Sequence, residues 1–574
     1  MPSSLIELRP DRRLLDHEFE GYKLDLQALP HFSSSLPLPV DRVFPDDVQY
    51  SFIHAKLFAL HNHLTLDYWD YSYKFYYINN KRQVCQQSFE TDKTFRSAVV
   101  YTIPSTVERK SGHFNLCLSF VSQGLAVVSD GAGYLHIVDT GPRNKPEESN
   151  HWQTLHSSLV LGEGKYFVIL DSRLQEKNSK QTLHCLLQSV EQTEKHFSSV
   201  LTWVSFENTD HTWSQVSLKE LKGKGIIHYA AIETSCEALY IASDNAFTFT
   251  HDTEKNITEP ETEDLRKIIY TWLQTSEDIT LTLKLEAGFD KKLVHVDVSP
   301  LQIKVSYAGK SFIEGKLRHK VDSEFTTWNV QDNGQVDILV TKTESMLWDE
   351  LLEGGDAKGE QVMDASLVEE AHRRLAHLCA ETEVTPDLTS TGLSTQELEE
   401  CDAPSEEDTV LVRINATNHQ ITHRAPLSVH QYLFNIKIET EEVPALALRH
   451  DVDACIWQPY SQLINEMWPV KHQGTLKAFG YVQSSKQNRK FVTCPPNFTY
   501  SVVCEASRHI FIYQSSGKRD CELRKRTAGV MKPIKVGQQH VFNIENYGEV
   551  IGINATNEYL FILTESSLIA IHIV

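Results

Sequence analysis

Short runs of alternating apolar and polar residues fill the stretch from 270 to 348, and this pattern constrains the fold more than any other feature of the chain. The apolar members are Ile279, Leu281, Leu283 and Leu285, then Val294, Val296 and Val298, then Ile303 and Val305. A period of two places these side chains on one face of a strand. Turn-forming residues separate the runs: Pro300, Ala308-Gly309 and Asp332-Asn333-Gly334. The stretch therefore predicts a compact β-sandwich built from hairpins.

An ordered set of aromatic, glycine and lysine positions accompanies the alternation. It comprises Tyr270-Thr271-Trp272-Leu273-Gln274-Thr275, Gly315-x-Leu317-x-x-x-Val321, Thr327-Trp328-x-Val330, Gly334, Ile338-x-Val340-x-Lys342 and Trp348. In these positions residues 258–350 resemble the CS domain of the NudC family, a β-sandwich shared by co-chaperones of the ninety-kilodalton heat-shock chaperone. The resemblance implies that Tyr270, Trp272, Gln274, Trp328 and Gly334 are structural signature residues.

A two-strand unit recurs on both sides of the sandwich: an apolar run, a short polar turn and an alternating strand. Clear copies lie at 125–138, 238–249 and 559–573, and looser ones at 166–172 and 510–517. Such units are typical of the inner hairpins of β-propeller blades, whose small sheets need neighbours to cover their faces. We therefore predict an all-β chain in which residues 1–255 and 410–574 together form one irregular propeller of about seven blades. The apolar C-terminal strand should close the ring against an N-terminal strand; two separate β domains are the alternative.

Strong acidity is confined to the segment that follows the sandwich. Residues 349–408 hold eighteen Asp and Glu against three Lys and Arg, a net charge of −15 out of −22 for the whole chain. Ser366-x-x-Glu369 forms a capping box, and Leu367, Ala371, Leu375 and Leu378 share one side of a helix. Residues 351–408 should thus be an acidic linker with a short helix over 364–380, followed from 385 by a disordered tether.

Composition excludes several classes of function. Away from the acidic linker the charge is nearly balanced, so no basic domain is available to bind a nucleic-acid backbone. No apolar run approaches the roughly 20 residues that cross a membrane, which predicts a soluble protein. The ten cysteines include no Cys-x-x-Cys pair, and no apolar leader precedes the first domain. Reduced thiols in the cytoplasm, or in the nucleus, are the expectation.

No catalytic motif occurs in the sequence. A phosphate-binding loop, a Gly-x-Ser-x-Gly nucleophile turn and a His-Glu-x-x-His helix are all absent. His450-Asp451 with Asp453 could hold a metal, but no further histidine stands at ligand spacing, so a structural role is favoured. We expect no enzyme activity, no cofactor and no metal.

Protein-binding residues are expected on the sandwich. Lys316, Arg318 and Lys320 alternate with inward-pointing Leu317 and Val321, which predicts an outward basic stripe. This stripe is either a solvated face or a docking site for an acidic surface, which could be a partner's or the chain's own tether. Trp348 is a candidate exposed anchor, whereas Trp272 and Trp328 are assigned to the core because burying a tryptophan stabilises a small domain by several kcal/mol.

The function predicted from these features is that of a non-enzymatic co-chaperone or adaptor. The CS domain would bind a chaperone or client, and the propeller would supply a rigid platform. By resemblance, the partners are the ninety-kilodalton heat-shock chaperone, propeller-type clients or both, bound by a monomeric protein. The alternative is a pure interaction scaffold in which the propeller binds the partner and the CS domain is passive.

Overall fold

The computed structural model divides the chain into two compact units. Unit 1 comprises Met1–Ile257 and Glu397–Val574, and unit 2 comprises Thr258–Gln396. The structure describes residues 4–70, 73–104, 108–144, 152–177, 179–193, 196–255, 257, 270–275, 277–284, 291–308, 310–331, 334–346, 348, 350–353, 359–361, 409–427, 430–464, 467–484, 486, 488–515, 520–521 and 534–573. The helix expected over 364–380 and the tether from 385 to 408 lie outside these residues.

Unit 1 is all-β apart from short helices, namely α1 (Phe52–Ala59), α3 (Phe479–Ser484), η1 (Arg12–Leu14) and η3 (Glu545–Tyr547). Its described strands form seven sheets, numbered I to VII in the order in which they pack on one another. Sheet I contains β1 (Ser4–Leu5), β28 (Ile421–Pro426), β27 (Val410–Asn415), β17 (Ala238–Ser243) and β16 (Ile227–Ile232). Sheet II contains β29 (Tyr432–Ile436), β30 (Ala445–His450), β31 (Asp453–Pro459) and β32 (Val470–Leu476).

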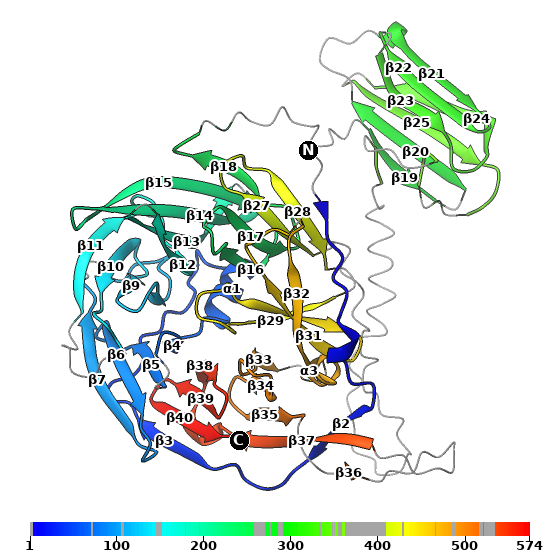
Figure 1. The fold of residues 1–574 in the computed structure, drawn as a ribbon. Helices are drawn as coiled ribbons and strands as arrows, with labels where there is room; N and C mark the ends of the chain where they lie inside the picture. The colour runs from blue at the N-terminus through cyan, green and yellow to red at the C-terminus, as the bar shows by residue number, and fades with distance from the viewer. Residues whose placement is uncertain are drawn as a thin grey trace. The chain divides into compact units, whose positions relative to one another are not determined.

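The remaining five sheets follow the same plan of four or more strands (Figure 1). Sheet III contains β2 (Phe19–Leu24), β37 (Ile534–Asn543), β35 (His509–Gln514), β34 (Tyr500–Glu505) and β33 (Arg489–Thr493), with β36 (Asp520–Cys521) beside β37. Sheet IV contains β3 (His31–Ser35), β40 (Ser567–His572), β39 (Tyr559–Thr564) and β38 (Val550–Ala555). Sheet V contains β4 (Thr65–Leu66), β5 (Lys74–Ile78), β6 (Gln83–Phe89) and β7 (Phe95–Thr102). Sheet VI contains β8 (Cys117–Phe120), β9 (Leu125–Ser129), β10 (Tyr134–Asp139) and β11 (Gln153–Leu159), and sheet VII contains β12 (Val168–Lys177), β13 (Lys180–Thr193), β14 (His196–Thr209), β15 (Thr212–Gly223) and β18 (Thr248–Asp252).

Buried side chains fill the space between successive sheets. The shared clusters include Tyr240 with Trp457 (I and II), Ala447 with Val503 (II and III), Val502 with Ile562 (III and IV), Phe561 with Phe75 (IV and V), Tyr76 with Val128 (V and VI), Leu135 with Leu183 (VI and VII), and Leu201 with Ile241 (VII and I). Each sheet thus packs on two neighbours and has both faces covered. For this reason β17 and β39 read as continuous apolar runs and are buried along their whole length.

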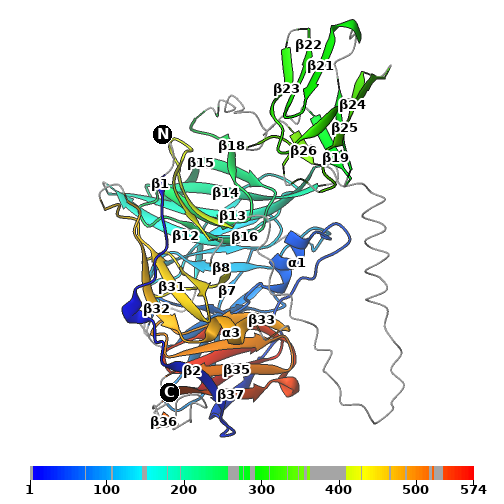
Figure 2. The same ribbon diagram turned by 90° about the vertical axis from the view of Figure 1, so that its right-hand side faces the viewer.

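The N-terminal segment supplies outer strands to sheets formed by the C-terminal part of the chain. β1 pairs in parallel with β28, β2 in parallel with β37, and β3 antiparallel with β40. Between β1 and β2, the backbone N–H of Asp11 donates to Nδ1 of His472 on β32, and Figure 2 shows the segment in blue passing this strand before it reaches β37. The expected pairing of the last strand with an N-terminal strand is confirmed by β3 and β40.

Two of the three clear two-strand units predicted from sequence form hairpins, whereas the looser copies at 166–172 and 510–517 each supply a single described strand, β12 and β35. β9 pairs with β10, and β39 pairs with β40. The unit at 238–249 was wrongly predicted as a hairpin, because β17 stays in sheet I between β16 and β27 while β18 pairs with β15 at the edge of sheet VII. The chain therefore leaves sheet I after β17 and returns to it at β27, and unit 2 is inserted between these two neighbouring strands.

Unit 2 is a two-layer sandwich, as the alternation predicted. One sheet contains β24 (Val321–Val330), β25 (Gln335–Lys342), β20 (Asp278–Lys284), β19 (Tyr270–Gln274) and β26 (Gly359–Gln361), and the other contains β21 (Val294–Ser299), β22 (Gln302–Tyr307) and β23 (Lys310–Lys316), with η2 (Lys291–Leu293) before β21. The apolar members of the runs, among them Leu281, Ile303 and Val305, meet in one core. Gly334 adopts a φ of 83° in the turn between β24 and β25, a conformation that glycine reaches without strain.

Candidate protein-binding site

The basic stripe of unit 2 lies where β23 ends and β24 begins. Lys316, Arg318 and Lys320 are exposed, while Leu317 and Val321 are buried in the core of the sandwich. The alternation predicted from sequence is therefore present, because successive side chains of an extended chain point to opposite sides. Protein binding by the three cations stays a prediction.

The first residues of the acidic segment cover part of this stripe. Glu353 N–H donates to the carbonyl of Lys316 at 2.8 Å, and Arg318 N–H donates to the carbonyl of Leu351 at 3.0 Å. Side chains add two ion pairs: Lys316 Nζ lies 2.5 Å from Glu353, and Arg318 Nη1 lies 3.4 Å from Glu350. Hydrogen bonding to Lys316 lowers the pKa of Glu353.

Two leucines hold this acidic stretch in place. Leu351 and Leu352 are buried in the sandwich core, and Leu352 forms a bridge with Leu317. A Cβ at Gly315 would lie 2.9 Å from Leu352 Cδ1, so the glycine leaves room for the leucine side chain. The ion pairs are solvent-exposed, and the anchoring therefore comes mainly from apolar burial.

Trp348 was wrongly predicted to be an exposed anchor. Its side chain is part of the core and only 3% of the residue is exposed. Gln274 holds it there: the Trp348 N–H donates to Gln274 Oε1 at 2.8 Å, and Gln274 Nε2 donates to the Trp348 carbonyl at 2.8 Å. The ring therefore has no surface to offer a partner, and its edge-on neighbour is His319.

Lys342 completes this buried polar group and explains the lysine of the sequence pattern. Its ammonium donates to Gln274 Oε1 at 2.8 Å and to the carbonyls of Thr275 and Met346 at 2.7 Å each. Burial lowers the pKa of Lys342. With three acceptors and the face of Trp348 nearby, the charged amine is satisfied inside the domain.

The two remaining tryptophans of the pattern differ. Trp272 is buried, as predicted, whereas Trp328 is 45% exposed, so its assignment to the core is wrong. The reason is position: β24 is an edge strand, and no second strand pairs with it on its other side among the described residues. Phe325, on the same strand, is 67% exposed. The exposed pair Phe325 and Trp328 is called the β24 edge below.

Sequence reasoning missed Phe325, although one signal was available. Val321 and Val330 are both buried but lie at odd and even positions of one strand. The phase can change only through extra residues, and the register with β25 shifts between Asp322 and Thr327. Phe325 lies within this bulge.

The described residues show neither a metal site nor a membrane-spanning helix. No group of three or more His, Cys, Asp and Glu residues there could hold a metal ion. No described helix is both long and apolar enough to cross a bilayer. Seven cysteines that the structure describes carry free thiols, among them Cys85, Cys117 and Cys185.

Comparison with known proteins assigns the sandwich of unit 2 to a known domain family. The family model described as CS domain matches residues 268–342. Over 589 residues the chain is 33% identical to NudC domain-containing protein 1 of Mus musculus, covering 100% of this chain and 99% of that protein. The chain belongs to the NudC domain-containing protein 1 family.

Other relatives cover different shares of the chain. NudC domain-containing protein 1 of Xenopus tropicalis is 32% identical over 591 residues, covering 100% of this chain and 99% of its own. NudC domain-containing protein 2 of Homo sapiens is 26% identical over 96 residues, which are 16% of this chain and 61% of that protein. Likeness to the NudC domain-containing protein 1 family thus extends through unit 1 as well as the CS domain.

Proposed function

We propose that this protein is a non-enzymatic co-chaperone or adaptor that binds protein partners through its CS domain. The observation that carries the proposal is the β24 edge. Phe325 and Trp328 are exposed on a strand that pairs only with β25 among the described residues, and the open edge of such a strand can bind an extended peptide or another strand. Aromatic side chains of this kind are enriched at protein interfaces.

Unit 1 would serve as the platform, and we assign it to a β-propeller of seven blades formed by residues 1–255 and 410–574. Support comes from the seven sheets and from the clusters that link each sheet to the next and sheet VII to sheet I. The pairing of β3 with β40 supplies the strand exchange that fastens such a ring.

The partners that we propose are those expected from the resemblance to the NudC family. Co-chaperones with a CS domain bind the ninety-kilodalton heat-shock chaperone, and propeller-type proteins are candidate clients. The proposed setting is the cytoplasm, with the nucleus as a second location, and the proposed state is a monomer. The formal net charge of −22 argues against direct binding to nucleic acid.

Affinity capture with full-length variants tests the proposal. Partners retained by the intact chain should be lost on deletion of residues 258–350 and reduced by the double variant Phe325→Ala/Trp328→Ala. Leu293→Ala, at an exposed leucine 43% accessible in the same domain, is the matched control and should capture partners normally. Equal capture by all four proteins would contradict a binding role for the CS domain.

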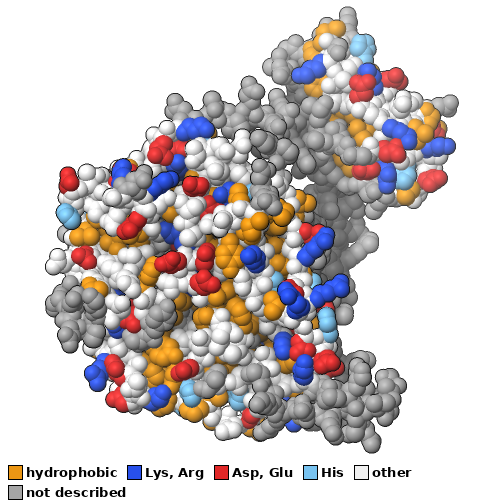
Figure 3. Space-filling model, in the orientation of Figure 1, with side chains coloured by type: hydrophobic (Ala, Val, Ile, Leu, Met, Phe, Trp, Pro, Cys, Tyr) orange, Lys and Arg blue, Asp and Glu red, His pale blue; other side chains and the backbone are white. Residues whose placement is uncertain are grey.

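The alternative, a scaffold that binds through unit 1, has its own observation. Figure 3 shows hydrophobic side chains gathered over β31 and β32. In the loop between these strands Leu463, Ile464 and Met467 are exposed, and Ile464 and Met467 exchange backbone hydrogen bonds that hold them outward. The two functions differ in one assay: the isolated CS domain should slow thermal aggregation of a model client only if it acts as a co-chaperone.

A further inference from the structure

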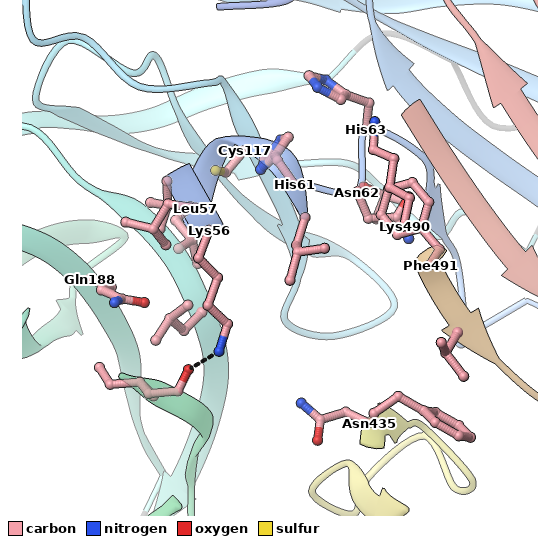
Figure 4. Close-up of a pocket in the computed structure, with 18 of the residues that line it drawn as sticks. Lys56, Leu57, His61, Asn62, His63, Cys117, Gln188, Asn435, Lys490 and Phe491 are labelled. Carbon is pink, nitrogen blue, oxygen red and sulfur yellow. Dashed lines mark hydrogen bonds between the residues drawn. The ribbon is translucent and has the colours of Figure 1, made fainter. Parts of the chain in front are cut away.

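Unit 1 encloses a cavity of about 700 Å³. Strands from six of its seven described sheets line it, including β5, β8, β12, β16, β29 and β33, and α1 contributes Ile53, Lys56 and Leu57. Figure 4 shows Lys56 reaching from α1 into the open space, with Gln188 to its left and Asn435 below it. The volume lies within the range of about 300 to 1,000 Å³ that is usual for small-molecule sites.

Lys56 is an ammonium group without a carboxylate partner among the described residues. Its Nζ donates to the carbonyl of Ile227 at 3.1 Å. The neighbouring acid, Asp244, is already bound by His228 Nε2 at 2.7 Å and by the Thr409 hydroxyl at 2.9 Å. Two of the three Lys56 protons therefore remain for a ligand or for solvent.

Amide side chains with unused hydrogen-bonding capacity also face the cavity. Gln188 on β13 and Gln483 on α3 are only 5% and 4% exposed, and neither side chain has a hydrogen-bond partner in the described part of the protein. Asn435 on β29 is a third amide in the lining. Buried amides are ordinarily hydrogen-bonded, so their direction into an open space indicates a polar occupant.

The charge of the lining favours an anion. Arg489 adds a second cation to Lys56, Lys490 is paired with Glu549, and the only acid among the lining residues that the structure describes, Asp41, is paired with Arg109. His61 and His63 are neutral at physiological pH, because burial lowers the pKa of His61 to about 4 and that of His63 to about 2. The cavity therefore combines excess positive charge with neutral donors and acceptors.

We propose that this cavity is a binding site for a small organic anion. A carboxylate or phosphate group of the ligand would pair with Lys56, and a polar skeleton would use the amides of Gln188, Gln483 and Asn435. This site is separate from the β24 edge, and the proposal does not depend on the CS domain binding a chaperone. A bound anion would also give Lys56 the counter-charge that it lacks.

Titration calorimetry on the full-length protein tests the site with three probes: inorganic phosphate, citrate and glucose 6-phosphate. We expect saturable binding of at least one probe to the wild-type chain. Lys56→Met should weaken that binding by about tenfold or more, the effect of removing one charge-assisted hydrogen bond. Preference among the probes separates a phosphate ligand from a carboxylate ligand.

Controls keep the test independent of folding. Lys23→Met changes an exposed lysine on β2 and should leave binding unchanged. Asn435→Ala truncates an exposed side chain at the cavity and should weaken binding several-fold without lowering the melting temperature of the free protein. The proposal is overturned if no probe binds saturably, or if Lys56→Met and Asn435→Ala bind as well as wild type.

Discussion

Gln274 and Trp348 exchange two hydrogen bonds of 2.8 Å, one donated by the Trp348 N–H and one accepted by its carbonyl. The amide side chain thus acts as a short strand partner for the backbone that follows β25. Because Gln274 Oε1 also accepts from Lys342, the same atom keeps a buried ammonium satisfied. The glutamine of the sequence pattern is therefore a structural residue of the CS domain.

Replacing this glutamine should destabilise the CS domain strongly. Gln274→Leu leaves the buried N–H and carbonyl of Trp348 unpaired and removes one acceptor of Lys342, at a cost of about 3 kcal/mol or more. Hydrogen exchange of the full-length protein should show protection in β19 and β25 falling about a hundredfold. Gln302→Ala, at an exposed residue of β22, is the control. Unchanged protection in Gln274→Leu would contradict a structural role for the hydrogen bonds between Gln274 and Trp348.

The two flanks of unit 1 should depend on each other for folding. Residues 1–250 and 410–574, coexpressed as separate chains, are expected to copurify and unfold in one transition, because clusters such as Tyr240 with Trp457 join them. Each flank alone exposes these surfaces and should give a poorly dispersed amide spectrum. A sharp transition from either flank by itself would contradict the single-propeller assignment.

A buried ion pair between the flanks gives a sharper test. Arg413 Nε and Nη2 lie 2.8 and 3.0 Å from Glu233, which also accepts from the Tyr240 hydroxyl at 2.8 Å. Glu233→Ala should lower the free energy of unfolding of unit 1 by about 3 to 5 kcal/mol, because it leaves Arg413 charged and unpaired in the interior. The double variant Glu233→Ala/Arg413→Met should recover part of the loss in urea unfolding. No recovery would show that Arg413 is not the source of the cost.

Stability of unit 1 should also fall in acid through Glu549. Arg42 and Lys490 hold this carboxylate at 2.6 and 2.8 Å, and hydrogen bonding lowers its pKa from 4.5 to about 2. The stabilisation is therefore fully present above pH 4.5 and is lost as the pH falls towards 2. The Glu549 side chain is 39% exposed, so solvent screening limits the effect to about 1 kcal/mol. Glu549→Gln should cost that amount at pH 7 and progressively less below pH 4.5, whereas Glu20→Gln, at an exposed residue of β2, should cost nothing at either pH.

The features that the sequence predicted are those determined by local periodicity. Alternation at Leu281 and Ile303 gave the strands of the sandwich, and the apolar run of β39 gave a strand covered on both faces. Exposure of Trp328 depends instead on its strand being at the sheet edge, which pairing order decides and spacing does not. Trp348 is buried through Gln274, a contact across more than seventy residues of chain.

The cavity could not be predicted from the sequence, because its lining depends on contacts between distant parts of the chain. Lys56 occurs in a run, Phe52–Ala59, with no clear apolar face. Its surroundings come from strands of six sheets that are far apart in the chain. Likewise, β18 pairs with β15 and not with β17 because both edges of β17 are occupied by β16 and β27, and no local signal marks this arrangement.

The last prediction concerns the acidic tether and the basic stripe of Lys316, Arg318 and Lys320. Two of these cations already pair with Glu353 and Glu350, so residues 383–408 are expected to extend the same contact towards Lys320. Such exposed contacts are weak and are screened within about 8 Å at physiological salt. A tethered segment still competes, because its effective concentration is near millimolar.

Deleting residues 383–408 should therefore tighten the binding of an acidic peptide to the full-length protein at low salt and leave it unchanged at high salt. Fluorescence anisotropy across a salt series measures both effects. Charge reversal of Lys316, Arg318 and Lys320 together should abolish peptide binding and the difference between the two chains, since it removes the common docking site. Reversal of Lys304, which pairs with Glu314 on the neighbouring strand β23, is the matched control. Equal affinity of the deleted and intact chains at every salt concentration would make the stripe a solvated face, with Leu351 and Leu352 alone holding the acidic segment in place.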